Sequence, residues 1–172
     1  HISTHARLTF NLMEGLKLSL FGAYTYNIVE NSQYLPTSVW ANGQAYKGTK
    51  KRESLLGNMM LTYKKNWKKH FFDVLALAEL QKETYTGYYT TVSNFSTDKF
   101  GYNNLQAGAL RLWEGTNSYY EQPRLASFMG RFNYTYADRY VLTLNARTDA
   151  SSKFGANHKW GFFPSASAAW VI

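Results

Sequence analysis

The sequence has no cysteine, few prolines and no long apolar run, and each absence narrows what the protein can be. Without cysteine, a disulfide framework, a thiolate nucleophile and a cysteine-ligated zinc site are excluded. No stretch reaches the roughly 18 apolar residues of a transmembrane helix, and the start of the chain has no signal-peptide pattern. Only 3 of the 172 residues are proline, while tyrosine, threonine, phenylalanine and leucine are frequent. This mixture favours strands over helices, in a chain of one ordinary domain's length.

Catalytic motifs are also missing from the sequence. The four histidines are scattered and match no paired-histidine metal motif. There is no serine nucleophile elbow and no phosphate-binding P-loop. We therefore expect no catalytic residue, no bound metal, no cofactor and no enzymatic activity.

Positive charge is in excess, with a formal net charge of +8, which raises the question of nucleic-acid binding. Nucleic-acid-binding proteins gather their cations on one face or one arm. Here the densest runs, Lys47 to Arg52 and Lys64 to Lys69, are predicted to lie between strands. We interpret them as solvated loop charge and expect no nucleic-acid partner.

Alternation of apolar and polar residues is the strongest local signal. In residues 140–147 the even-numbered positions are apolar and most odd-numbered positions are polar. Residues 127–136 alternate in the same way, and the short connection at 136–139 predicts an antiparallel hairpin. Similar patterns predict further hairpins at 6–26 and 53–81, and a last strand from about Trp160 to Ile172.

The predicted connections differ in length on the two sides of the sheet. Short turns follow Met13, Tyr63 and Tyr136, whereas long polar stretches span residues 28–52, 82–123 and 150–159. Short turns on one side and long loops on the other are typical of outer-membrane barrels. We therefore predict an all-β antiparallel meander of about seven long strands, forming an arc of a transmembrane β-barrel. The alternative is a soluble β-sandwich, in which the apolar faces pack on each other.

The apolar faces end in aromatic residues, as the membrane-interface girdles of barrels do. These are Tyr24, Tyr26, Tyr63, Tyr134, Tyr136, Tyr140 and Trp170. In a sandwich the same rings would cap the core.

The last third of the chain carries a long ordered motif. Residues 127–140 read SFMGRFNYTYADRY, residues 147–155 read RTDASSKFG, and residues 160–170 read WGFFPSASAAW. These runs resemble the barrel region of SusC/RagA-type TonB-linked outer-membrane proteins, over about residues 124–172. Two positions depart from the family pattern: Ala150 replaces a usual glycine and Lys153 a usual arginine. Since alanine makes a positive φ costly, we expect a changed path where this strand enters its loop. Pro164 predicts a bulge or a local kink in the last strand.

The resemblance implies a role in nutrient import across the outer membrane of a Gram-negative bacterium. Residues 1–172 would then be part of a barrel domain of about 22 strands, without its plug and remaining strands, since about seven strands cannot close a barrel. The implied partners are a SusD-like surface lipoprotein, the TonB complex (through the plug) and outer-membrane lipid. The implied cargo is an oligosaccharide or a peptide. The alternatives are a secreted carbohydrate-binding β-sandwich and a surface adhesin.

Two sets of residues are candidates for functional positions. If the apolar face meets lipid, the polar face points into the lumen, and its charges favour a ladder of pairs that fixes strand register. The predicted lumen-facing residues are Arg131, Asn133, Asn145, Arg147 and Asp149. Aromatic side chains of the long loops are candidates for ligand contact, with packing over the barrel mouth as the alternative. These are Trp40, Tyr88, Tyr89, Trp113 and Tyr119.

Overall fold

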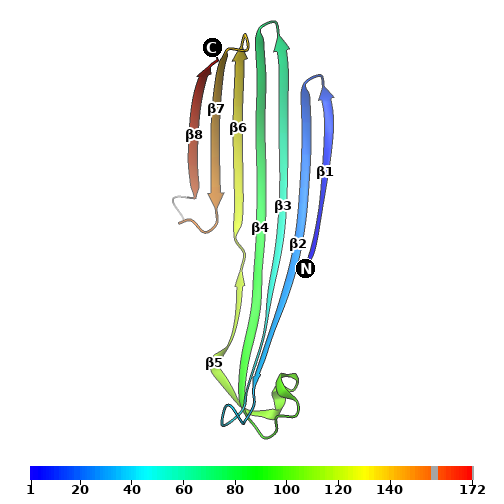
Figure 1. The fold of residues 1–172 in the computed structure, drawn as a ribbon, viewed down its shortest axis with the longest axis vertical. Helices are drawn as coiled ribbons and strands as arrows, with labels where there is room; N and C mark the ends of the chain where they lie inside the picture. The colour runs from blue at the N-terminus through cyan, green and yellow to red at the C-terminus, as the bar shows by residue number, and fades with distance from the viewer. Residues whose placement is uncertain (156–158, 172) are drawn as a thin grey trace. The chain divides into compact units, whose positions relative to one another are not determined.

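Long antiparallel strands make up most of the chain in the computed structural model, which describes residues 1–155 and 159–171 (Figure 1). The eight strands are β1 (Ile2–Met13), β2 (Leu16–Leu35), β3 (Gln44–Trp67), β4 (His70–Phe95), β5 (Gly108–Glu121), β6 (Arg124–Tyr136), β7 (Tyr140–Ser151) and β8 (Trp160–Trp170). Two short 3₁₀ turns, Gly101–Asn103 and Leu105–Ala107, lie between β4 and β5. All strands belong to one sheet of order β1-β2-β3-β4-β6-β7-β8, and β5 also pairs with β4. The all-β antiparallel prediction is confirmed, and no second sheet exists among the described residues to form a sandwich.

Three strands are much longer than the alternation predicted. β2 has 20 residues, β3 has 24 and β4 has 26. The prediction of loops over 28–52 and 82–123 was therefore wrong, because these strands continue into both stretches and β5 lies within the second. The basic run Lys47 to Arg52 lies in β3, as does most of Lys64 to Lys69, rather than between strands. Repeated tyrosine and threonine in the second half of β4 favour strand structure and were the signal for its length.

The chain divides into two compact units. Unit 1 contains His1–Ile2, Thr25–Glu53 and Glu83–Gln122; unit 2 contains Ser3–Tyr24, Ser54–Lys82 and Pro123–Ile172. Residues 156–158 and 172 lie outside the described residues, so the predicted loop at 150–159 and the predicted strand end at Ile172 are described only in part.

Unit 2 is a twisted ladder with regular register. β4 pairs with β6 from His70↔Tyr136 to Lys82↔Arg124, and β6 pairs with β7 from Leu125↔Ser151 to Tyr136↔Tyr140. β7 and β8 pair without a shift at Ala146↔Pro164, so the bulge predicted at Pro164 is wrong. Ala150 pairs with Trp160 and is not among the residues with positive φ, as expected for alanine. The changed path into the loop stays a prediction.

The short turns of unit 2 are tied to one another by backbone hydrogen bonds. Gly15 has φ +80°, and a Cβ there would come within 2.0 Å of the Lys64 carbonyl oxygen, so only glycine fits. Its own carbonyl accepts a hydrogen bond from the Lys64 amide at 2.8 Å. Likewise the Ala137 amide donates to the Lys69 carbonyl at 2.7 Å, and the Val171 amide donates to the Arg139 carbonyl at 2.8 Å. These contacts fix the relative register of neighbouring hairpins.

Unit 1 has a small core of its own. Ala45, Val92 and Phe95 are buried there, and Tyr34, Leu105 and Ala107 pack around them. The Tyr34 and Phe95 rings meet edge to face, with centroids 5.4 Å apart, an arrangement that aromatic quadrupoles favour. The ends of β2, β3 and β4 are therefore joined by packed side chains as well as by backbone pairing.

Candidate functional site

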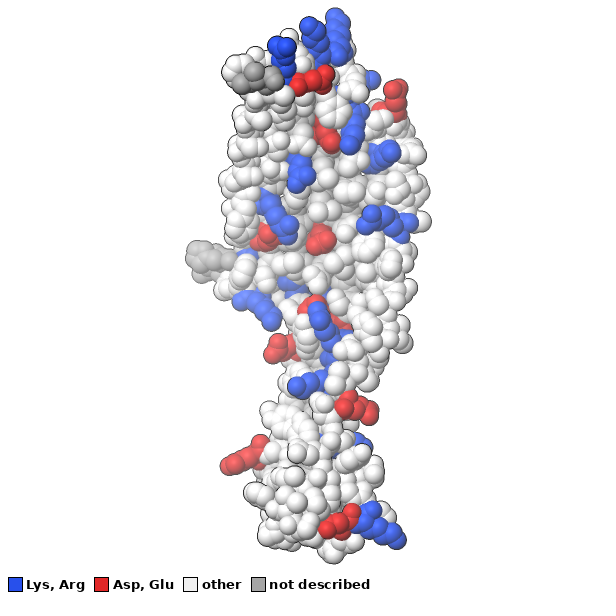
Figure 2. Space-filling view, in the orientation of Figure 1, with Lys and Arg blue, Asp and Glu red and all other residues white. Residues whose placement is uncertain are grey.

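One face of unit 2 is polar and carries rows of hydrogen-bonded side chains across the strands. The first row contains Asn58, whose amide donates to the Glu79 carboxylate at 3.4 Å. Glu79 lies opposite Ser127, and Ser127 lies opposite Asp149. Arg147 Nε donates to both oxygens of the Asp149 carboxylate, at 3.0 and 2.8 Å. Figure 2 shows basic and acidic side chains interspersed on one face of the molecule.

Two further rows cross the same face. Arg131 Nε donates to Asn145 Oδ1 at 2.8 Å, and Asn145 Nδ2 donates to Ser165 Oγ at 3.2 Å, linking β6, β7 and β8. Asn133 lies opposite Asp73, which forms an ion pair with Lys64 at 3.2 Å. The structure thus places all five residues predicted to face a lumen on one face of the sheet. Because these side chains are exposed and their charges are screened by water, each pair contributes little to stability, so the rows serve register more than stability.

The opposite face of unit 2 is apolar and ends in a row of aromatic rings. The rings of Trp67, His70, Tyr136, Tyr140 and Trp170 follow one another with centroids 5.0 to 6.3 Å apart. The girdle predicted at Tyr136, Tyr140 and Trp170 therefore forms a continuous row, and Trp67 and His70 extend it.

A second aromatic contact lies at the other end of the strands. Trp160 stacks on Phe128 with centroids 6.0 Å apart. Trp160 and Trp170 are the two ends of β8, about 33 Å apart along an extended strand. At the roughly 40° tilt of barrel strands this separation spans about 25 Å, the height of the apolar band of outer-membrane barrels.

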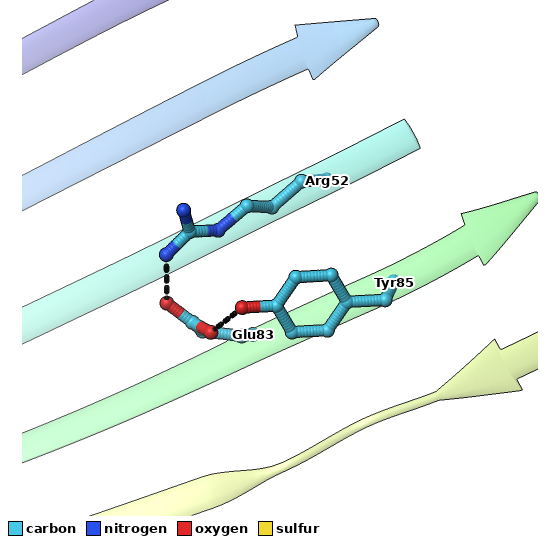
Figure 3. Close-up of polar contacts among 3 residues, drawn as sticks. All are labelled: Arg52, Glu83 and Tyr85. Atoms are coloured by element: carbon cyan, nitrogen blue, oxygen red, sulfur yellow. Dashed lines mark hydrogen bonds and ion pairs between the residues drawn. The ribbon is translucent and has the colours of Figure 1, made fainter. Parts of the chain in front are cut away.

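Unit 1 contains a charged cluster that the sequence analysis missed (Figure 3). Arg52 from β3 donates to the Glu83 carboxylate of β4 at 2.6 Å, and the Tyr85 hydroxyl donates to the same carboxylate. The hydrogen bond to Glu83 raises the pKa of Tyr85. Counting outward from the turn after Trp67 would place Arg52 opposite Tyr85, where its guanidinium lies 5.5 Å from the ring centre. This count could have predicted the cluster from the sequence, although Arg52 and Glu83 are 31 residues apart.

No family model matches the chain, but curated proteins and solved structures do. TonB-dependent receptor P3 of Formosa agariphila is 30% identical over 165 residues, which cover 94% of this chain and 16% of that protein. TonB-dependent receptor SusC of Bacteroides thetaiotaomicron is 29% identical over 185 residues, covering 95% of this chain and 16% of that protein. The chain belongs to the SusC-like TonB-dependent receptors. It spans about a sixth of the length of these curated relatives.

Solved structures give the same fold for this receptor chain. The RagAB peptide transporter superposes with a TM-score of 0.83 at 21% identity, covering 96% of the chain and 19% of the transporter chain. The RagAB peptide importer in its 'open-open' state superposes with a TM-score of 0.65 over the same share. The prediction of an arc from a receptor barrel is therefore confirmed. The curated relatives are TonB-dependent transporters of the outer membrane, which are not enzymes.

The loop aromatics predicted to contact ligand do not converge in the receptor chain. Gly87 lies opposite Tyr119, and a Cβ on Gly87 would clash with the Tyr119 ring at 2.7 Å, so the ring covers that glycine. Tyr89 lies on this face too and packs on Tyr46, with ring centroids 6.0 Å apart. Tyr88 points to the opposite face, because neighbouring residues of a strand alternate. Packing against neighbouring residues, the alternative to ligand contact, thus accounts for the positions of Tyr89 and Tyr119.

The remaining two aromatics are exposed. Trp40 lies in the turn between β2 and β3, and Trp113 lies in an irregular stretch of β5, where the pairing with β4 shifts between Tyr89 and Thr91. The Trp113 side chain is 88% exposed. It borders a cavity of about 580 Å³ that also contacts Gln106 and Arg111. Ligand contact by these residues stays a prediction.

Asp98 joins the loop after β4 to the end of β2 and the turn that follows it through hydrogen bonds. Its carboxylate accepts hydrogen bonds from the Tyr34 hydroxyl at 2.6 Å, the Thr37 hydroxyl at 2.8 Å and the Thr37 amide at 3.1 Å. The hydrogen bond from Tyr34 lowers the pKa of Asp98 below 3.8 and raises the pKa of Tyr34 to about 12. The contact therefore requires an ionised carboxyl and a neutral phenol.

We expect this contact to hold unit 1 together between about pH 4 and pH 10. A lowered Asp98 pKa adds stability that disappears as the pH falls through that pKa; a raised Tyr34 pKa adds stability that disappears between pH 10 and about 12. Amide hydrogen exchange in residues 96–107, corrected for its intrinsic pH dependence, should rise at both extremes. Tyr34→Phe should flatten the alkaline rise; an unchanged alkaline rise would contradict the assignment.

No group of three or more potential metal ligands occurs among residues 1–155 and 159–171. Within the same residues, no helix is long and apolar enough to cross a membrane.

Proposed function

We propose that the chain forms part of the wall and extracellular loops of an outer-membrane transporter that imports oligosaccharides or peptides. In this proposal residues 1–172 belong to a barrel domain, and the apolar face of unit 2 meets lipid. The polar face then faces the lumen, with Arg131, Asn133, Asn145, Arg147 and Asp149 toward the transport path. The observation that carries the proposal is a sheet with one face apolar between two levels of aromatic rings and the other crossed by polar rows.

The partners follow from the same assignment. A SusD-like surface lipoprotein would dock on the extracellular side, to which unit 1 would belong. The TonB complex would act through a plug that lies outside this chain. The polar rows suit a structural role, since Arg147 and Asp149 satisfy each other and Arg131 is bound to Asn145. Nothing in this arrangement provides a reacting group, so we propose that the chain contributes no catalysis.

Two measurements test the proposal. Nitroxide labels at Leu142 and Thr143, neighbours on opposite faces of β7, are introduced into the full-length receptor in lipid vesicles. We expect high accessibility to oxygen at Leu142, because oxygen concentrates in the bilayer, and high accessibility to a water-soluble nickel complex at Thr143. Burial of Leu142 from both reagents would favour a soluble sandwich.

Import is tested with bacteria that carry or lack the receptor gene. Uptake of labelled oligosaccharides and peptides should fall in the deletion strain and return with the intact gene. If the Leu142 label is accessible to oxygen but the deletion strain takes up every cargo as before, the results would instead support a surface adhesin with the same barrel fold.

A further inference from the structure

A groove with a floor of small residues lies on the apolar face of unit 2, at the end near Trp160. One row of the sheet runs Leu80, Ala126, Ala150, Trp160 across β4, β6, β7 and β8. The two outer side chains are large and 64% and 58% exposed, while the two central ones are alanines. Together with Leu55 and Gly57 of β3 they line an open groove of about 990 Å³.

The row next to this floor, toward the middle of the strands, contains two large rings, Phe128 and Phe162. Phe128 stacks on Trp160, so these rings border the groove on that side. The alanine floor between Leu80 and Trp160, on an exposed apolar face, provides room for an alkyl chain. Burying such a chain stabilises a complex by the apolar area removed from water.

Cations gather where the groove reaches the end of the strands. Lys82 and Arg124 are register partners on β4 and β6, one step beyond Leu80 and Ala126 on the same face. Both side chains also line the groove, as does Lys159.

Backbone hydrogen bonds position the main chain of two of these residues, Arg124 and Lys159. Arg124 exchanges two hydrogen bonds with Ser152: its amide donates to the Ser152 hydroxyl at 2.9 Å, and its carbonyl accepts from the Ser152 amide at 3.0 Å. The Lys159 carbonyl accepts from the Ser151 amide at 3.2 Å. Three cationic residues on adjacent segments thus line the mouth of one apolar groove, beside a tryptophan of the interfacial type.

We propose that this groove binds one lipid with a phosphate-bearing, negatively charged headgroup. The phosphate would contact Lys82, Arg124 and Lys159, and an acyl chain would lie over Ala126 and Ala150 between Leu80 and Trp160. The inference rests on the proposed function, in which the apolar face of unit 2 meets lipid. It goes beyond that function by naming a specific site on the lipid-facing wall.

The test uses full-length receptor in nonionic detergent, titrated with lipids and observed by native mass spectrometry. The probes are phosphatidylglycerol and phosphatidylcholine with identical acyl chains, and inorganic phosphate as a competitor. We expect one phosphatidylglycerol to bind at least about tenfold more tightly than phosphatidylcholine. Lys82→Gln with Arg124→Gln should weaken phosphatidylglycerol binding about thirtyfold, since each cation near a lipid surface contributes about a fivefold effect. Millimolar inorganic phosphate should not displace the lipid, because it cannot fill the groove.

Matched variants separate charge, shape and fold. Lys82→Arg with Arg124→Lys keeps both charges and should keep binding. Ala126→Phe fills the floor and should weaken both lipids. Lys64→Gln removes a cation from the polar face, where it pairs with Asp73, and should change neither. Equal affinity for the two lipids, no effect of the double neutral variant, or displacement by phosphate alone would each overturn the site. If these outcomes occur while the Leu142 label remains accessible to oxygen, the lipid site fails and the barrel assignment stands.

Discussion

Replacing Leu144 by arginine is expected to reduce the stability of the receptor in a bilayer by about 2–4 kcal/mol, the cost of arginine near the midplane of a barrel's lipid face. Leu144 lies near the middle of β7, opposite Phe132 and Ala166 on the apolar face, and is 42% exposed. The charged side chain would have to leave the apolar band or carry water into it. Urea titration of receptor folded into lipid vesicles measures the loss in the free energy of unfolding.

The matched control is the adjacent residue on the other face. Thr143 lies opposite Asn133 and Ser167, both polar, so Thr143→Arg should change the free energy of unfolding by no more than about 0.5 kcal/mol. Equal losses in the two variants would show that β7 tolerates arginine on neither face. A harmless Leu144→Arg would show that the apolar face does not contact lipid.

Truncating Phe95 is expected to loosen unit 1 without unfolding unit 2. Phe95 is 7% exposed and packs with Val92 and Tyr34. Its ring also leaves little free space, because a Cβ on Gly108 would lie 3.0 Å from Phe95 Cζ. Removing a buried phenylalanine costs about 3–5 kcal/mol, so the segments that open with this core should exchange amide hydrogens about 100-fold faster or more.

Hydrogen exchange followed by mass spectrometry resolves the two units. Amides of residues 108–121 should respond to Phe95→Ala, whereas those of residues 140–151 should not. Trp113→Ala is the control, because a side chain that is 88% exposed contributes little to packing. Protection lost equally in both segments would mean that the two units unfold as one.

The faces of unit 2 could be predicted from the sequence because alternation and short turns are local. Once Tyr136 and Tyr140 are paired across a short turn, every later pair of β6 and β7 follows by counting. The ion pair of Arg147 with Asp149 could be predicted for the same reason, since the two residues lie two positions apart on one face.

Unit 1 could not be predicted in the same way. β5 contains Gly108, Gly115 and Asn117 and has a shift in its pairing, so its period-two signal is broken. The Asp98 contacts with Tyr34 and Thr37 join segments more than 60 residues apart, which no turn count reaches. The edge-to-face contact of Phe95 with Tyr34 is equally long-range and has no local sequence signature.

On one side of β4 the partner changes partway along the strand. Residues 85–95 of β4 pair with β5, residues 70–82 pair with β6, and β5 ends at Glu121, just before Gln122 and Pro123. Insertions or deletions between β4 and Pro123 therefore leave every β4–β6 pair of unit 2 unchanged. Over evolutionary time this lets the segment between β4 and Pro123 change in length and sequence, while unit 2 keeps the register of its strands.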